Sequence, residues 1–90
     1  MKKEIVKIFK SLADTTRLEV VRVMASLNEV TCQDLQKHFK LSQPTLSHHF
    51  NKLIETNILL YRKEGKMNYY KLNKKLLADH GININKFINK

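Results

Sequence analysis

Apolar side chains recur at helical spacing through the first part of the chain. One stripe follows the i, i+3, i+4, i+7 pattern of a helix face, and a second recurs every three residues. They predict amphipathic helices over residues 3–12 and after Asp14, a good N-cap residue. The apolar positions are Ile5, Ile8, Phe9 and Leu12 in the first stripe, and Leu18, Val21, Met24 and Leu27 in the second. The chain therefore begins with two helices that each need an apolar partner.

Two further helices are predicted with a short connection between them. Thr31 and Asp34 have the spacing of a capping-box variant, which opens a third helix that ends near Lys40. Ser42 is a natural N-cap for a fourth helix, and it puts Pro44 in the first turn, where backbone N–H groups have no intrahelical partner. The proline therefore marks a helix start, and the pair predicts a helix-turn-helix.

The fourth helix separates its apolar from its polar side chains. At 100° per residue, Leu46, Phe50 and Leu53 share one buried face. The opposite face and its flanks present hydrogen-bonding groups, of the kind that a recognition helix carries into the major groove. We expect the DNA-contacting residues of this helix to be Ser42, Gln43, Pro44, Thr45, Ser47, His48, His49 and Lys52. The helix-turn-helix then occupies about residues 31–56.

The pattern changes to β-forming residues after Asn57. Two such segments flank a glycine and predict a β-hairpin over about residues 58–72. Arg62, Lys63 and Lys66 make this hairpin basic, so we expect it to contact DNA as a wing. The predicted fold is mainly α with a β-hairpin wing, a single winged helix-turn-helix domain over residues 1–90.

The charge of the chain points to the same kind of partner. Its 17 Lys and Arg against 8 Asp and Glu give a net charge of +9. Eight of the basic and two of the acidic side chains lie in residues 40–75. Such an excess favours nucleic acid or an anionic membrane as a partner, and no apolar run approaches the roughly 20 residues of a membrane span. We therefore predict double-stranded DNA as the partner, no membrane association and a cytoplasmic location.

The C-terminal part predicts self-association. Asn73 can cap a last helix, and apolar residues continue beyond it to the end of a chain of only 90 residues. This excess of apolar residues predicts a homodimer formed by residues 3–12 and 74–89. The expected interface residues are Ile5, Ile8, Phe9, Leu76, Leu77 and Phe87.

Metal, cofactor and catalytic chemistry find little support in the sequence. His48 and His49 are neighbours on a helix and point about 100° apart, so they cannot easily chelate one ion. A single cysteine, Cys32, excludes an internal disulfide and a multi-cysteine zinc cluster. Cys32 is either a small buried hydrophobe or a redox-sensitive thiol. We expect no metal, no cofactor and no enzymatic activity.

Three motifs resemble the ArsR/SmtB family of winged-helix transcriptional repressors. FKSLADTTRL at residues 9–18 is similar to the family's F-K-A-L-A-D-P-T-R-L, and LSQPTLSHHF at 41–50 is similar to its recognition helix, L-S-Q-P-T-V-S-R-H-L. EGK at 64–66 with YYKL at 69–72 resembles its wing, R-E-G-R…Y-Y-R-L. The resemblance implies a repressor that dimerises through its first and last helices and presents two recognition helices to an inverted-repeat operator.

The family's metal motifs are broken in this chain. Where many members have Cys-Val-Cys-Asp-Leu, this sequence reads TCQDL at residues 31–35, with its one thiol at the middle position. Asp79 and His80 are adjacent, whereas members that bind zinc use Asp-x-His with a later His-x-x-Glu or His-x-x-His. The effector stays unknown. Two alternatives remain open, a winged-helix module that binds protein or RNA and a redox-responsive repressor based on Cys32.

Overall fold

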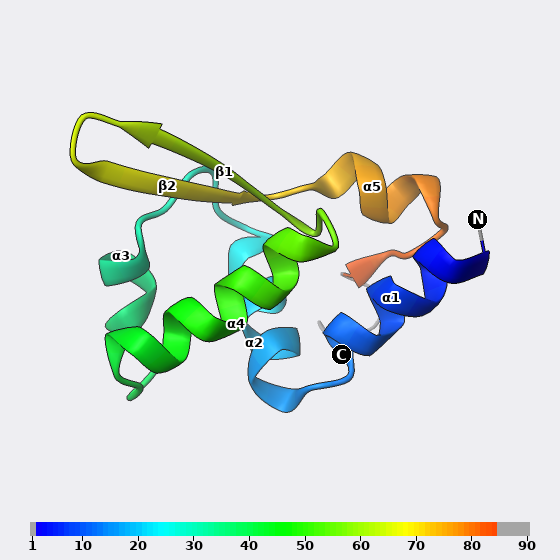
Figure 1. Cartoon of the computed structure of the whole chain (residues 1–90), viewed down its shortest axis with the longest axis horizontal. Helices are drawn as coiled ribbons and strands as arrows, with labels where there is room; N and C mark the ends of the chain where they lie inside the picture. Colours follow the sequence, from blue (N-terminus) through cyan, green and yellow to red (C-terminus); the bar gives the residue numbers. More distant parts are fainter. Residues whose placement is uncertain (1, 85–90) are drawn as a thin grey trace.

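A computed structural model describes residues 2–84 as five helices and one two-stranded antiparallel sheet (Figure 1). The elements in chain order are α1 Lys2–Leu12, α2 Thr15–Met24, α3 Cys32–Gln36, α4 Gln43–Glu55, β1 Leu59–Glu64, β2 Met67–Leu72 and α5 Lys74–Asp79. The architecture is a winged helix-turn-helix, as the sequence predicts. Phe87, one of the predicted interface residues, lies outside the described residues.

Side-chain caps begin the helices at the predicted places. Asp14 accepts a hydrogen bond from the backbone N–H of α2 at 2.9 Å, and Asn73 accepts one from α5 at 3.1 Å. Thr31 and Asp34 form a reciprocal capping box at the start of α3. Ser42 caps α4 and leaves proline in the first turn. Each cap satisfies a donor that the first helical turn cannot satisfy itself.

The end of α4 fixes where the hairpin begins. Asn57 has a φ of +63°, and its backbone N–H donates to the carbonyl of Ile54. The N–H of Ile58 donates to the carbonyl of Leu53, which completes a Schellman motif. The chain therefore turns sharply out of α4 and enters β1 one residue later.

The hairpin has a register set by a two-residue loop. Leu59 pairs with Leu72, Glu64 pairs with Met67, and Gly65 takes a φ of +60° in the loop between the strands. A glycine adopts this left-handed conformation at no steric cost, and hairpin loops of two residues require it. The prediction of a glycine turn is confirmed.

The core gathers side chains from the helices and from both strands. Its buried apolar residues are Ile8, Leu12, Val20, Val21, Met24, Val30, Leu35, Leu46, Phe50, Leu53, Ile58, Leu59, Leu72, Leu77, Ile82 and Ile84. One predicted stripe is partly wrong, because Leu18 is 39% and Leu27 36% exposed. α2 packs against both α1 and α4, and this position turns Val20 and Val21 inward.

The third helix is shorter than predicted. It ends at Gln36 rather than near Lys40, because the backbone tightens there and the N–H of His38 donates to the carbonyl of Leu35 at 2.9 Å. The side chain of Gln36 then donates to the carbonyl of Leu41 at 3.3 Å and holds the connection to α4.

Different elements of the fold lie at the two ends of the molecule. α3, the beginning of α4 and the tip of the β1–β2 hairpin lie toward one end, whereas α1 and α5 lie toward the other (Figure 1). None of the helices within residues 2–84 is long and apolar enough to cross a membrane.

Candidate nucleic-acid interface

The first turn of α4 is built as an exposed polar surface. Ser42 Oγ accepts from the backbone N–H of Thr45 at 3.3 Å and donates to the Thr45 hydroxyl at 2.9 Å. Gln43 and Pro44 lie beside this cap, and all four side chains are exposed. The positive end of the helix dipole and uncovered hydrogen-bonding groups therefore occur together at this point of the surface.

Packing on the opposite side holds α4 in place. Leu46, Phe50 and Leu53 have no exposed surface, as their spacing predicts. The ring of Phe50 lies 4.6 Å, centroid to centroid, from the ring of Tyr70 in β2. Burial raises the pKa of the Tyr70 hydroxyl. α4 and the hairpin therefore pack against each other, in part through this aromatic contact.

Not all predicted residues of α4 are equally accessible. His48 and Lys52 are exposed, whereas Ser47 and His49 are half-buried. The hydroxyl of Ser47 lies 3.9 Å from the thiol of Cys32 in α3. Ser47 therefore faces the neighbouring helix at least in part.

His49 faces α2 rather than open solvent. Its side chain is 14% exposed, and its Nδ1 lies 3.8 Å from Asp14 Oδ1 and 3.4 Å from Arg17 Nη1. Arg17 Nε also donates to the carbonyl of Ser11 at 2.7 Å. The backbone N–H of Arg17 holds the pKa of the Asp14 carboxyl below its usual value. This cluster joins the end of α1, the start of α2 and the middle of α4, so His49 is placed to support the recognition helix.

The hairpin carries two kinds of cation. Lys63 and Lys66 are exposed at and near its tip, and neither forms an ion pair with an acidic side chain among residues 2–84. Arg62 instead bonds to Glu29 and Glu64, at closest distances of 2.6 Å in each case. The bond between Arg62 and Glu29 raises the pKa of the guanidinium and lowers that of the carboxyl. Lys71 of β2 is likewise exposed and forms no ion pair within residues 2–84, so the unpaired positive charge of the hairpin comes from its lysines.

Sequence reasoning missed Arg17 and Glu29. Each acts through a partner more than thirty positions away, at His49 and Arg62 respectively. Nothing in the local pattern of either residue indicates that partner, although Glu29 is exposed and Arg17 is half-buried. Only the tertiary fold brings these pairs together.

Two of the predicted dimer contacts belong to the protomer's own core. Ile8 is 0% and Leu77 2% exposed, so neither side chain is available for the dimer contact expected of it. Their side chains are buried because α1 and α5 pack their apolar faces inward. Phe9, by contrast, is 54% exposed on α1, and Val6 beside it is 48% exposed. Ile5 and Leu76 are half-buried.

Metal-ligating side chains do not converge in the part of the chain that the structure describes. No group of three or more His, Cys, Asp or Glu residues within residues 2–84 could hold an ion. Cys32 is half-buried and free. His80 Nδ1 lies 2.8 Å from the carbonyl of Leu76 in its own helix.

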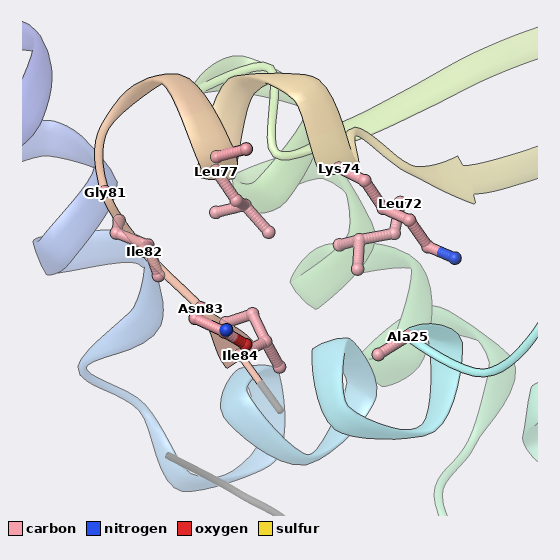
Figure 2. Close-up of a pocket in the computed structure, with 9 residues that line it drawn as sticks. Ala25, Leu72, Lys74, Leu77, Gly81, Ile82, Asn83 and Ile84 are labelled. Carbon is pink, nitrogen blue, oxygen red and sulfur yellow. The ribbon is translucent and has the colours of Figure 1, made fainter. Parts of the chain in front are cut away.

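A hollow of about 440 Å³ lies between α5 and the end of α2 (Figure 2). Its lining is mostly apolar, with Lys74 as the one ionisable side chain among the lining residues. The residues around it are Ala25, Leu72, Lys74, Leu77, Ala78, Gly81, Ile82, Asn83 and Ile84.

Known proteins resemble this chain in sequence and in structure. The family model described as bacterial regulatory protein, arsR family, matches residues 14–61. The arsenical resistance operon repressor of Staphylococcus aureus is 41% identical over 83 residues, which cover 92% of this chain and 79% of that protein.

Solved structures share the fold. HlyU from Vibrio cholerae N16961 superposes with a TM-score of 0.82 at 23% identity, covering 99% of this chain and 96% of that one. A homodimeric winged helix-turn-helix DNA-binding domain from Mycobacterium bovis, Mb0332, superposes with a TM-score of 0.76 at 20% identity, covering 87% of this chain and 71% of that one.

Proposed function

Because this chain belongs to the arsR family of bacterial regulatory proteins, we propose that it represses transcription by binding an inverted-repeat operator as a homodimer. It is a DNA-binding transcriptional regulator with a winged helix-turn-helix fold. The observation that carries the proposal is the uncovered polar start of α4, together with a hairpin whose exposed lysines form no ion pair within residues 2–84. Bound across a promoter in the cytoplasm, such a dimer would exclude the polymerase.

In this proposal the start of α4 reads bases. Gln43 and Thr45 are exposed in the first turn, the part of a recognition helix that enters the major groove. A Gln side chain can make two hydrogen bonds to adenine, at N6 and N7. His48 and Lys52 lie further along the exposed surface and serve the flanking bases or phosphates. Ser42 and Pro44 set the helix start and lie close to the backbone of the duplex.

The hairpin supplies affinity without sequence information. Lys63 and Lys66 reach phosphates flanking the major-groove contact, because both are exposed and unpaired among the described residues. Two contacts of this kind in each protomer make binding strongly dependent on salt.

Dimerisation occurs at the end of the molecule opposite the hairpin tip. Val6 and Phe9 expose apolar surface on α1, and we place the half-buried Ile5 of α1 and Leu76 of α5 at the same interface. Mb0332, which has the same fold, is a homodimer. A two-fold axis through this surface presents two recognition helices to DNA, and it predicts half-sites about 10 base pairs apart or a multiple of that spacing.

The release signal differs from that of the metal-responsive relatives. The S. aureus relative is an arsenical resistance repressor, yet Cys32 has no second thiol in this chain, and the described residues hold no metal-binding cluster. We therefore propose that arsenite, cadmium and zinc do not release this protein from DNA. Tight binding of any of them that depends on Cys32 or His80 would contradict this assignment.

The proposed function is tested by binding to duplex DNA at increasing salt concentration. We expect the protein to shift a duplex that carries its operator, with competition by other duplex DNA and much weaker competition by duplex RNA. Binding that favours RNA would support an interaction module of another kind. A salt-independent interaction would contradict the role of the lysines.

A further inference from the structure

The guanidinium of Arg62 donates three of its five N–H groups to two carboxylates. Nε bonds to Glu29 Oε2 at 2.6 Å, Nη2 bonds to Glu29 Oε1 at 2.8 Å, and Nη1 bonds to Glu64 Oε2 at 2.6 Å. Its centre also lies 4.5 Å from the centroid of the Tyr69 ring. The two carboxylates offset the charge of Arg62, so the three side chains together present no net positive charge to a phosphate.

Glu29 connects the hairpin to a different part of the chain. It lies in the segment between α2 and α3, which leads into the helix-turn-helix. The next residue, Val30, exchanges two backbone hydrogen bonds with Tyr70 of β2, both 2.8 Å long. A paired side chain and a paired backbone therefore join this segment to the hairpin at adjacent positions.

The contact with α4 and the bond to Glu29 act on opposite faces of the hairpin. Tyr70 lies against Phe50 of α4, with Tyr61 paired opposite it in β1. Arg62 and its cross-strand partner Tyr69 are the next pair along, so they project from the other face. α4 supports one face of the wing, and the bond to Glu29 restrains the other.

We infer that Glu29 and Arg62 are positioning residues that hold the wing at the angle at which Lys63 and Lys66 reach DNA. Arg62 itself makes no phosphate contact, contrary to the expectation from its basic character. The inference rests on the proposed DNA binding. The new element is that the affinity for DNA depends on an acidic residue, Glu29, which does not itself contact DNA.

The test compares Glu29→Gln with Glu64→Gln. Each change removes one negative charge beside the same guanidinium, but only Glu29 connects the hairpin to the α2–α3 segment. Affinity for the selected operator duplex is measured for both variants across a range of salt concentrations. If Arg62 contacted phosphate, either variant would free it, and both would bind more tightly.

A positioning role predicts divergent behaviour. We expect Glu29→Gln to weaken binding by about two- to five-fold, the range typical of losing an exposed ion pair. We expect Glu64→Gln to bind as well as the wild type or slightly better. Tighter binding by both variants, or equal affinities for the two, would overturn the inference.

A second measurement does not depend on DNA. Amide hydrogen exchange at Val30 and Tyr70 reports on the junction between the hairpin and the α2–α3 segment. We expect faster exchange at both amides in Glu29→Gln than in Glu64→Gln, and equal rates would overturn the inference. If the wild type fails to bind duplex DNA, the proposed function fails, while the exchange rates still decide whether Glu29 holds the hairpin.

Discussion

Ser42 is the N-cap of α4, and we propose that it also lies close to DNA; substitutions at this position can separate the two roles. Its Oγ accepts from the Thr45 N–H and donates to the Thr45 hydroxyl. Replacement of a Ser N-cap by Ala removes a helix-terminal partner and typically costs about 1 kcal/mol. For a domain of this size, such a loss lowers the melting temperature by about 4–8 °C.

Three variants make the test specific. Ser42→Ala should show the full loss in urea or thermal unfolding, and Ser42→Gly should lose only a few tenths of a kcal/mol. Ser42→Asp should fold as stably as the wild type, because aspartate caps equally well and its charge suits the helix N-terminus. The same aspartate should weaken DNA binding by roughly five-fold, since like charges about 4 Å apart in water repel by about 1 kcal/mol.

The pattern across the two assays decides the result. An Ala variant as stable as the wild type would refute the capping argument. An Asp variant that binds DNA as tightly as the wild type would refute the placement of the α4 start against the phosphates.

Three further changes test other parts of the account. Lys66→Ala should reduce the slope of log affinity against log salt by about 1. Lys75→Ala, on α5 and paired with Asp79, should leave that slope unchanged, and an equal change of slope in both variants would contradict the role of the hairpin tip. Phe9→Lys should shift the protein from dimer to monomer in sedimentation at micromolar concentration, while the matched Leu60→Lys on the hairpin should leave it dimeric. A monomeric wild type would contradict the proposed dimer. Asp14→Asn keeps the cap acceptor but removes a charge whose pKa is lowered by a backbone N–H of α2. The wild type should therefore have a larger unfolding free energy than this variant at about pH 6, and this difference should disappear as the pH falls through the lowered pKa of Asp14. A constant difference down to about pH 2.5 would contradict a stabilising charge at Asp14.

The parts of the fold that depend on local chemistry were predictable from the sequence. The capping side chains at Asp14, Ser42 and Asn73 act within three residues, and each begins its helix where expected. The glycine loop of the hairpin likewise depends on one residue's backbone freedom. The spacing of Leu46, Phe50 and Leu53 fixed which side of α4 faces outward, and with it most of the candidate site.

The parts that depend on tertiary packing were not predictable. Helical spacing identifies an apolar face but not what covers it, so Ile8 and Leu77 were assigned to a dimer although the protomer buries them itself. Leu18 was assigned to the buried face of α2 because the pattern cannot fix how a helix rotates against its neighbours. The pairing of Glu29 with Arg62 joins residues 33 positions apart, and a basic side chain in a wing gives no sign of it.

We propose that α4 reads base sequence while the hairpin supplies affinity. The most direct measurement is selection of bound sequences from random duplex DNA by the wild type and by Gln43→Ala. We expect the wild type to enrich an inverted repeat with half-sites about 10 base pairs apart or a multiple of that spacing. We also expect Gln43→Ala to relax one position in each half-site, at a cost of roughly 1–3 kcal/mol against the preferred base. Enrichment of no common sequence by the wild type, or an identical motif with uniformly weaker binding for the variant, would contradict the claim.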